Sequence, residues 1–193
     1  QVAVFDTAFG MAMPQKAYLY DIPYEYLDKY SLRRYGFHGT SHSFVSKETI
    51  KFAELNPETC KVIVCHLGNG ASISASIGGK CVDTSMGLTP LEGLIMGTRS
   101  GDIDPTVVQF IANKEGKTVD EVLNILNKKS GVLGISGVSS DFRDVYKGVT
   151  EGDEKCKLAF DKFVKTVTSY IGSYYILLGG VDTIIFTAGL GEN

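Results

Sequence analysis

The sequence lacks the features that identify disulfide-stabilised, zinc-stabilised or disordered proteins. Its 193 residues contain no tryptophan, five prolines and four cysteines, which are Cys60, Cys65, Cys81 and Cys156. No two of these cysteines form a C-x-x-C pair, and none stands at zinc-finger spacing from a histidine. Because 44% of the residues are hydrophobic, we expect an ordinary buried core with free thiols, in a reducing cytoplasm.

Long hydrophobic runs and clusters of basic charge are also missing. The uncharged stretch at residues 166–181 is 16 residues long and contains Ser, Thr, Tyr and three Gly, so it is too short and too polar to span a membrane. The net charge is -3, and the densest basic run is Arg33-Arg34. Nucleic acids and anionic membranes attract proteins through clustered positive charge, so the sequence predicts neither as a partner.

Strand-like and helical patterns alternate along the chain. We expect strands at residues 2–5, 61–66, 71–77, 80–84 and 181–187, with the first and last buried and with 71–77 and 80–84 forming a hairpin. We expect helices at residues 24–32, from Ser41 or Ser43 to 55, at 105–114, from a capping box at 118–121 to before 131, and at 154–178. Residues 86–105 have the composition of a long loop. This mixture predicts an α/β fold class with a mixed sheet flanked by helices.

Polar or charged side chains stand in four glycine-containing or turn segments that follow a strand or helix. These segments are Phe5–Thr7, Gly36–His42, His66–Gly70 and Gly97–Asp102, and they include all three histidines of the chain. Glycine lets backbone N–H groups approach an anion closely, and turns of this kind hold phosphates. No Walker A sequence is present. Together the segments predict a phosphoryl-transfer site, with Arg99 and His38 as candidates to stabilise the developing charge.

Each segment taken alone has a structural alternative. Asp6 is placed where a turn former or helix cap is common, and His42 and His66 are placed where they could brace loops. Gly68-Asn69-Gly70 has the composition of a hairpin turn. Arg99 could anchor its own loop through a nearby carboxylate. The joint occurrence of four such segments is what favours a phosphate site over these alternatives.

The same segments resemble the acetate kinase family, within the superfamily of acetate and sugar kinases, heat-shock chaperones and actin. The matching runs are Phe5–Phe9, Arg33–His42, Cys65–Gly70, Asp83–Gly93, Met96–Pro105 and Gly189–Asn193. They extend over the whole length of the chain. The resemblance implies transfer of the ATP γ-phosphate to acetate, giving ADP and acetyl phosphate, with magnesium and in a homodimer.

The resemblance also implies a fold and a division into domains. The fold would be a ribonuclease-H-like, actin-like ATPase domain. Residues 1–20 would end an amino-terminal domain, and residues 21–193 would form most of a nucleotide-binding carboxy-terminal domain. The family's metal-binding Asn, carboxylate-binding Arg and magnesium-binding Glu have no match here, so we expect the isolated chain to be nearly inactive. Gly10 stands where the family usually has His.

Roles for individual residues follow from the resemblance alone. Asp6, His38 and Arg99 would be catalytic, and Phe37 and Pro90 would contact the acetate methyl group. Phosphates would be contacted by His66, Leu67, Gly68, Asn69 and Gly70. The nucleotide would be contacted by Asp141, Phe142, Arg143, Gly189, Leu190, Gly191, Glu192 and Asn193. Because acetate is already ionised at pH 7, we expect Asp6 to orient magnesium and its waters and not to act as a base, and we expect no other metal ligand in this chain.

Two alternative functions remain open at the level of sequence. A kinase for propionate or butyrate would share the fold, and one methylene in an apolar pocket changes binding by only about 1–3 kcal/mol. Bulky Phe37 and Pro90 favour acetate. The second alternative is a non-catalytic actin-like module in which the nucleotide drives domain closure. Replacing Arg99 or His38 distinguishes the two classes, because only a kinase would lose phosphate transfer and keep ADP affinity.

Overall fold

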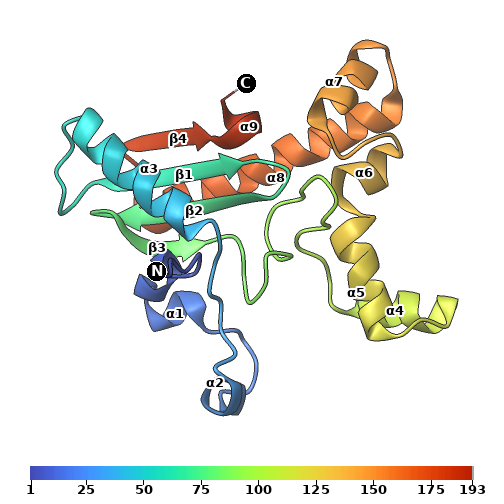
Figure 1. Ribbon diagram of the computed structural model, residues 1–193, viewed down its shortest axis with the longest axis horizontal. Coiled ribbons are helices and arrows are strands. Elements are labelled where there is room, and N and C mark those ends of the chain that lie inside the picture. The colour runs from blue at the N-terminus through green and yellow to red at the C-terminus, as the bar shows by residue number, and fades with distance from the viewer. Residues whose placement is uncertain (193) are drawn as a thin grey trace.

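A four-stranded mixed sheet forms the centre of the molecule in this computed structural model, which describes residues 1–192 (Figure 1). The strands are β1 (Lys61–Leu67), β2 (Ala71–Ile77), β3 (Lys80–Thr84) and β4 (Thr183–Thr187). They lie in the order β3-β2-β1-β4, with β1 antiparallel to β2 and parallel to β4. The hairpin prediction is confirmed, and Gly78 and Gly79, both with positive φ, join β2 to β3.

Different helices cover the two faces of β1. Val64 packs in a cluster with α3 (Gly39–Phe52), whereas the adjacent Cys65 belongs to the main core with α8 (Glu154–Leu178). Successive side chains of a strand point to opposite faces, so a strand covered on both sides needs a continuous apolar run. This explains why β1 is apolar over most of its length. It also fixes the position of the turn after β1, between the two helical layers.

The remaining helices of the described chain are short. They are η1 (Phe9–Ala12), α1 (Gln15–Tyr18), α2 (Glu25–Tyr30), α4 (Thr106–Glu115), α5 (Val119–Lys128), α6 (Gly131–Ser136), α7 (Phe142–Thr150) and α9 (Ala188–Gly191). Helices α6 and α7 pack on α8, while α4 and α5 extend away from the sheet (Figure 1). The capping box of Thr118 and Glu121 at the start of α5 is confirmed. No helix within residues 1–192 combines the length and hydrophobicity needed to cross a membrane.

Two strand predictions need correction. Residues 2–5 form no strand, and Val2 and Phe5 are 92% and 69% exposed, because no strand among residues 1–192 pairs with them. Strand β4 exists, but it is not buried as expected. It lies at the edge of the sheet and leaves Phe186 49% exposed. The apolar pattern therefore located β4 correctly and overestimated its burial, because pattern alone does not distinguish a central strand from an edge strand.

Candidate active site

The three histidines of the chain lie together, although they come from two elements. His38 precedes α3, His42 lies in its first turns, and His66 is near the end of β1. The ring centroids of His38 and His66 are 4.2 Å apart, and those of His42 and His66 are 6.2 Å apart. We call these three residues the histidine cluster. Its formation follows from the packing of α3 against β1, which brings the start of the helix to the end of the strand.

Burial keeps the histidine cluster uncharged near neutral pH. Desolvation lowers the pKa of His38 to about 4 and that of His42 to about 3, and it lowers the pKa of His66 as well. The negative charge of the Asp6 carboxylate raises the pKa of His38 and of His66, but this effect is smaller than that of desolvation. Unlike an imidazolium, a neutral imidazole has one N–H donor and one acceptor nitrogen, so its hydrogen-bond partners determine what it offers to a ligand.

Hydrogen bonds from serines hold the histidine rings. Ser72 on β2 lies between two of them, with its Oγ 2.8 Å from His38 Nδ1 and 2.7 Å from His42 Nε2. Ser74 Oγ lies 2.8 Å from His42 Nδ1. Sequence reasoning missed these serines. The alternation Ala-Ser-Ile-Ser-Ala-Ser-Ile in β2 was the available signal, because it places hydroxyls at every second position on one face of a strand that is buried.

Asp6 is attached to the same region through the backbone of the α3 start. The His38 N–H donates to Asp6 Oδ2 at 2.8 Å, and the Gly39 N–H donates to the Asp6 carbonyl at 2.9 Å. His38 adopts φ of 55°, an uncommon left-handed conformation for a residue with a side chain. A Cβ on Gly39 would lie 2.2 Å from the Asp6 carbonyl oxygen, so only glycine allows this approach. Asp6 itself is exposed beside the histidine cluster.

Arg99 and His38 face the same glycine. A Cβ placed on Gly70, in the turn between β1 and β2, would lie 3.3 Å from Arg99 Nη1 and 3.6 Å from His38 Nε2. The Arg99 guanidinium also donates to the carbonyl of Pro90 at 3.3 Å. The structure therefore brings together two of the three expected catalytic side chains over one stretch of open backbone. Arg99 also anchors its loop, but through the Pro90 carbonyl and not through the nearby carboxylate of the alternative prediction.

The loop that carries Arg99 is seated on the β1–β2 turn. The Gly97 N–H donates to the Asn69 carbonyl at 3.0 Å. A Cβ on Gly97 would overlap the Asn69 side chain, with only 1.6 Å to its Oδ1. The absence of a side chain at Gly97 therefore sets how closely the two loops approach, and with it the position of Arg99 relative to Gly70.

An open cleft lies next to this turn. It has a volume of about 700 Å³ and is lined by Gly68, Asn69, Ser140, Asp141, Phe142, Arg143, Gly189 and Leu190. We call it the open cleft. Seven of these eight residues are among those expected to contact phosphates or nucleotide, and they come from segments more than 100 positions apart in the sequence. Small-molecule sites commonly have volumes of about 300–1,000 Å³, so the cleft has the size of a nucleotide site.

The two charged groups of the open cleft are at least partly exposed and bind each other. Asp141 caps α7 by accepting from the Arg143 N–H at 2.9 Å, and it forms an ion pair with the Arg143 guanidinium at 2.6 Å. Hydrogen bonds from Arg143 lower the pKa of Asp141 to about 2. Phe142, by contrast, is mostly buried, and its ring lies edge-on to that of Phe163 with centroids 4.6 Å apart. Phe142 therefore supports the cleft wall from the core.

Other residues expected at the site have mainly structural contacts. Leu67 is buried in the core, and Phe37 packs partly buried against it. The Glu192 carboxylate accepts from the Ala188 N–H at 3.2 Å, and a Cβ on Gly191 would contact the backbone of Phe186. Asn193 lies outside the described residues. Leu67 and Glu192 can therefore contribute backbone atoms or a neighbouring charge, but their side chains point to partners within the protein.

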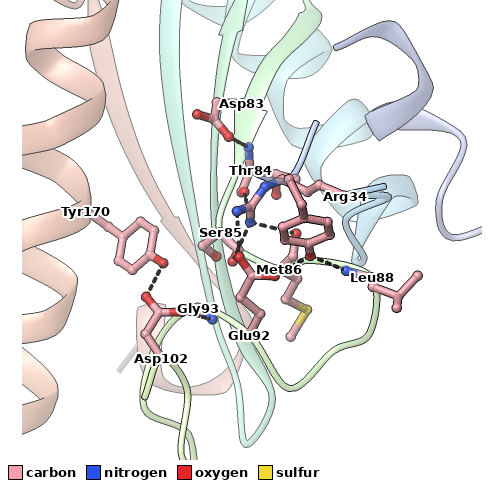
Figure 2. Close-up of polar contacts among 11 residues, drawn as sticks. Arg34, Asp83, Thr84, Ser85, Met86, Leu88, Glu92, Gly93, Asp102 and Tyr170 are labelled. Atoms are coloured by element: carbon pink, nitrogen blue, oxygen red, sulfur yellow. Dashed lines mark hydrogen bonds and ion pairs between the residues drawn. The ribbon is translucent and has the colours of Figure 1, made fainter. Parts of the chain in front are cut away.

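A second group of polar residues, which sequence reasoning missed, holds the loop after β3 (Figure 2). Arg34 forms an ion pair with Glu92 at 2.5 Å and donates to the backbone carbonyls of Thr84, Ser85 and Met86. The Tyr20 hydroxyl donates to Glu92 and accepts from the Leu88 N–H. These contacts fix the loop on which Pro90 lies. Arg34 and Glu92 both lie in runs that resemble the family. Because they are 58 positions apart, no local sequence pattern indicates that they form a pair.

Asp102 ties the other end of the same loop to helix α8. Its carboxylate accepts from the Tyr170 hydroxyl at 2.6 Å and from the Gly93 N–H at 2.8 Å (Figure 2). Burial and the hydrogen bond to Asp102 raise the pKa of Tyr170, so this hydroxyl stays protonated and donates throughout the physiological range. The segment that contains both Pro90 and Arg99 is therefore fixed at both ends by polar contacts.

Comparison with known proteins identifies the family. The Acetokinase family profile matches residues 1–193. Acetate kinases of Lachnoclostridium phytofermentans and Agathobacter rectalis are 65% and 62% identical to this chain, covering all of it and 49% and 48% of their own lengths. The chain thus spans about half the length of the curated relatives it matches.

Two solved structures confirm the fold class. The acetate kinase of Porphyromonas gingivalis superposes with a TM-score of 0.96 at 47% identity, covering 98% of this chain and 48% of its own. A propionate kinase from Francisella tularensis superposes with a TM-score of 0.94 at 48% identity, covering 98% of this chain and 49% of its own. The mixed sheet flanked by helices is thus the ribonuclease-H-like, actin-like ATPase fold that the sequence predicted. This chain belongs to the acetokinase family.

Proposed function

We propose that the protein transfers the γ-phosphate of ATP to the carboxylate of acetate, reversibly, giving ADP and acetyl phosphate. The observation that carries this proposal is the convergence of His38 and Arg99 on Gly70, beside a cleft of nucleotide size. In the reaction, an acetate oxygen forms a bond to the γ-phosphorus, and the bond between that phosphorus and the β–γ bridging oxygen breaks. The electron pair of the broken bond leaves with ADP.

Phosphoryl transfer needs positioned donors more than covalent chemistry. The charge of the transferring group spreads over its three equatorial oxygens, and Arg99 supplies a permanent positive charge at this place. His38, uncharged near neutral pH, supplies a hydrogen bond. The exposed backbone of Gly68-Asn69-Gly70 would hold the phosphates between the catalytic side chains and the open cleft. Asp141, Arg143 and residues Gly189 and Leu190 of helix α9 would hold the rest of the nucleotide.

Magnesium fits the site as an ion shared with the nucleotide. Residues 1–192 contain no group of three or more His, Cys, Asp or Glu side chains placed to hold a metal ion. Magnesium is usually held by one or two carboxylates together with substrate phosphates and water. The exposed carboxylate of Asp6, beside His38, would contact such an ion through water. When bound, the ion supplies positive charge that neutralises the phosphates.

The proposed substrate is acetate, with propionate or butyrate as the second candidate. The similarity to the Francisella propionate kinase supports the second candidate, and the bulk of Phe37 and Pro90 supports the first. We further propose that residues 1–20 end an amino-terminal domain and that residues 21–193 belong to the nucleotide-binding domain. The family resemblance supports a homodimer in the cytoplasm.

Transfer by the intact protein tests this function. Acetyl phosphate formation should require ATP and magnesium, and kcat/KM should fall from acetate to propionate to butyrate. The isolated 193-residue chain should be nearly inactive with all three acids. Nucleotide binding by the intact protein without transfer to any of the carboxylates would contradict the proposal and favour the non-catalytic actin-like module. A higher kcat/KM for propionate would shift the assignment to the second candidate.

A further inference from the structure

A continuous chain of hydrogen bonds leads from the interior of the sheet to His38. It runs from Ser74 to His42, from His42 to Ser72, and from Ser72 to His38, with all three separations between 2.7 and 2.8 Å. Ser74, His42 and Ser72 are fully buried, and His38 is partly exposed at the end of the chain. We call these four residues the serine–histidine relay. Because Ser74, His42 and Ser72 are not exposed to water, each O–H or N–H group in the interior of the relay can donate only to an acceptor of the protein.

If both rings are neutral, the donations of the relay can all run in one direction or all in the other. In one, the Ser74 hydroxyl donates to His42 Nδ1, His42 Nε2–H donates to Ser72, and the Ser72 hydroxyl donates to His38 Nδ1. In the other, every donation is reversed, beginning with His38 Nδ1–H. A third arrangement, in which Ser72 accepts from both rings, leaves the buried Ser72 hydroxyl without an acceptor among residues 1–192. Each serine hydroxyl has one proton, and each neutral ring has one N–H, so the choice at one end fixes the rest.

Ser74 determines the direction. Within residues 1–192, His42 Nδ1 is the hydrogen-bond partner of the Ser74 hydroxyl, and the structure offers that hydroxyl no second acceptor. In the reversed arrangement Ser74 would accept from His42, and its own buried O–H would donate to nothing. Leaving a buried donor without an acceptor is strongly unfavourable. The forward direction avoids this penalty, because every proton within the relay then has an acceptor.

From this geometry we propose that Ser74, His42 and Ser72 are positioning residues that hold neutral His38 as the tautomer with its proton on Nε2. That nitrogen is the one that faces Gly70 and, across it, the Arg99 guanidinium. The lowered pKa values of His38 and His42 agree with the neutral rings that the relay requires. His38 therefore presents an N–H donor to the site without having to be charged.

The consequence for phosphate transfer rests on the proposed function. A phosphoryl oxygen seated over Gly70 would accept a hydrogen bond from His38 Nε2–H. The opposite tautomer would present a lone pair to that oxygen, and the two would repel. The relay thus makes the productive tautomer the resting one, so no proton rearrangement precedes the reaction. The assignment of the tautomer itself does not depend on what the substrate is.

Nitrogen-15 NMR of the histidine rings in the intact protein tests the tautomer directly. At pH 7.5, without ligands, the wild-type spectrum should show His38 with a protonated Nε2 and an unprotonated Nδ1. A wild-type ring protonated on Nδ1, or on both nitrogens, would overturn the proposal. This measurement requires no variant to fold and no activity, so its outcome is independent of the proposed function.

Ser72→Ala tests the relay, with Ser76→Ala as the matched control. Ser76 lies on the same strand, is equally buried and donates to the Val62 carbonyl outside the relay. In Ser72→Ala, His38 should populate both tautomers, and kcat should fall about tenfold, the equivalent of one hydrogen bond, while KM for ATP changes little. In Ser76→Ala, the His38 signals and kcat should remain those of wild type. Equal His38 spectra in wild type and Ser72→Ala would contradict a role for the relay.

Discussion

The histidine cluster and the open cleft are adjacent, but they are built in opposite ways. In the cluster, buried serines bond to His38 and His42, and both rings lie in fixed positions on packed elements. In the cleft, Arg143 is exposed, Asp141 is partly exposed, and the two bind mainly each other. A buried, fully partnered group keeps its geometry when a ligand arrives, whereas an exposed ion pair can exchange partners.

This difference suggests a division of labour within one site. Groups that stabilise a transition state contribute most when they are held in place before the reaction. Groups that hold a nucleotide need to release it after each turnover, and exposed charges with adaptable partners suit that task. We therefore expect changes near the histidine cluster to lower kcat and changes in the open cleft to weaken nucleotide binding.

The largest effect is expected from Arg99→Ala. This change removes the permanent positive charge opposite His38, where charge spreads over the transferring phosphate. By analogy with other phosphoryl-transfer arginines, kcat should fall by about 10³-fold or more. Steady-state kinetics with saturating ATP and acetate would measure it. A loss confined to KM would contradict a role for Arg99 in the transition state.

Gly97→Ala should have the next largest effect on kcat. The new Cβ would overlap the Asn69 side chain and push the Arg99 loop away from the β1–β2 turn. Misplacement of a catalytic group by about 1 Å can reduce the rate by about 10²-fold. Gly172→Ala in α8 is the matched control, because a Cβ there meets nothing within 4 Å. It should leave kcat unchanged and raise the melting temperature slightly. Wild-type kcat in Gly97→Ala would show that this contact does not position Arg99.

Arg143→Ala should weaken nucleotide binding without lowering kcat. It removes an exposed charge from the open cleft and leaves the Asp141 cap of α7 in place, because that cap uses the Arg143 backbone N–H. Hydrogen bonds to charged groups contribute about 1.5–3 kcal/mol, so the KM for ATP should rise by about tenfold or more. Asp141→Ala tests the cap as well and should also destabilise the protein by about 1 kcal/mol. A fall in kcat as large as the rise in KM would contradict the separation.

Between pH 4 and 6.5, the free energy of unfolding should depend on pH because of the histidine cluster and not because of the open cleft. The pKa of His42 falls from 6.5 to about 3 on folding, so below pH 6.5 the unfolded chain binds a proton that the folded chain excludes. Stability should therefore be constant above pH 6.5 on this account and fall as the pH drops, by up to about 1.4 kcal/mol per pH unit for His42.

The open cleft contributes in a different pH range. The pKa of Asp141 is lowered from 3.8 to about 2, so its stabilisation is present above pH 3.8 and disappears only below it. Urea unfolding at pH 7.0, 6.0 and 5.0 would distinguish the contributions of the two regions to the free energy of unfolding. His42→Gln, which cannot titrate, should be less stable at pH 7 but show a shallower slope. Equal slopes for wild type and His42→Gln would contradict the burial of a neutral His42.

Local patterns in the sequence were enough to predict most elements and the residues that surround the site. The strand predicted at 61–66, the hairpin after it and the capping box at Thr118 depend on neighbours in the chain, and the structure confirms them, with the strand one residue longer. Glycine-flanked polar residues indicated where His38, His66 and Arg99 would meet. Such residues are recognisable because the chemistry of phosphate binding requires open backbone at defined places.

Contacts between distant segments could not be predicted in the same way. The Arg34–Glu92 ion pair and the placement of Ser72 between two histidines depend on how α3 and the β3 loop pack, which no local pattern encodes. Residues 2–5 failed as a strand for a related reason, because a strand exists only if another strand pairs with it. The edge position of β4 likewise depends on the order of the sheet and not on its apolar residues.

The most direct test of the separation between the two regions is calorimetric titration of magnesium-ADP into wild type, Arg99→Ala and Arg143→Ala side by side. Arg99→Ala, despite its large loss of kcat, should bind ADP with the dissociation constant of wild type, whereas Arg143→Ala should bind more weakly. If Arg99→Ala instead loses ADP affinity as severely as it loses activity, Arg99 holds the nucleotide or the fold, and the division of labour between the histidine cluster and the open cleft is contradicted.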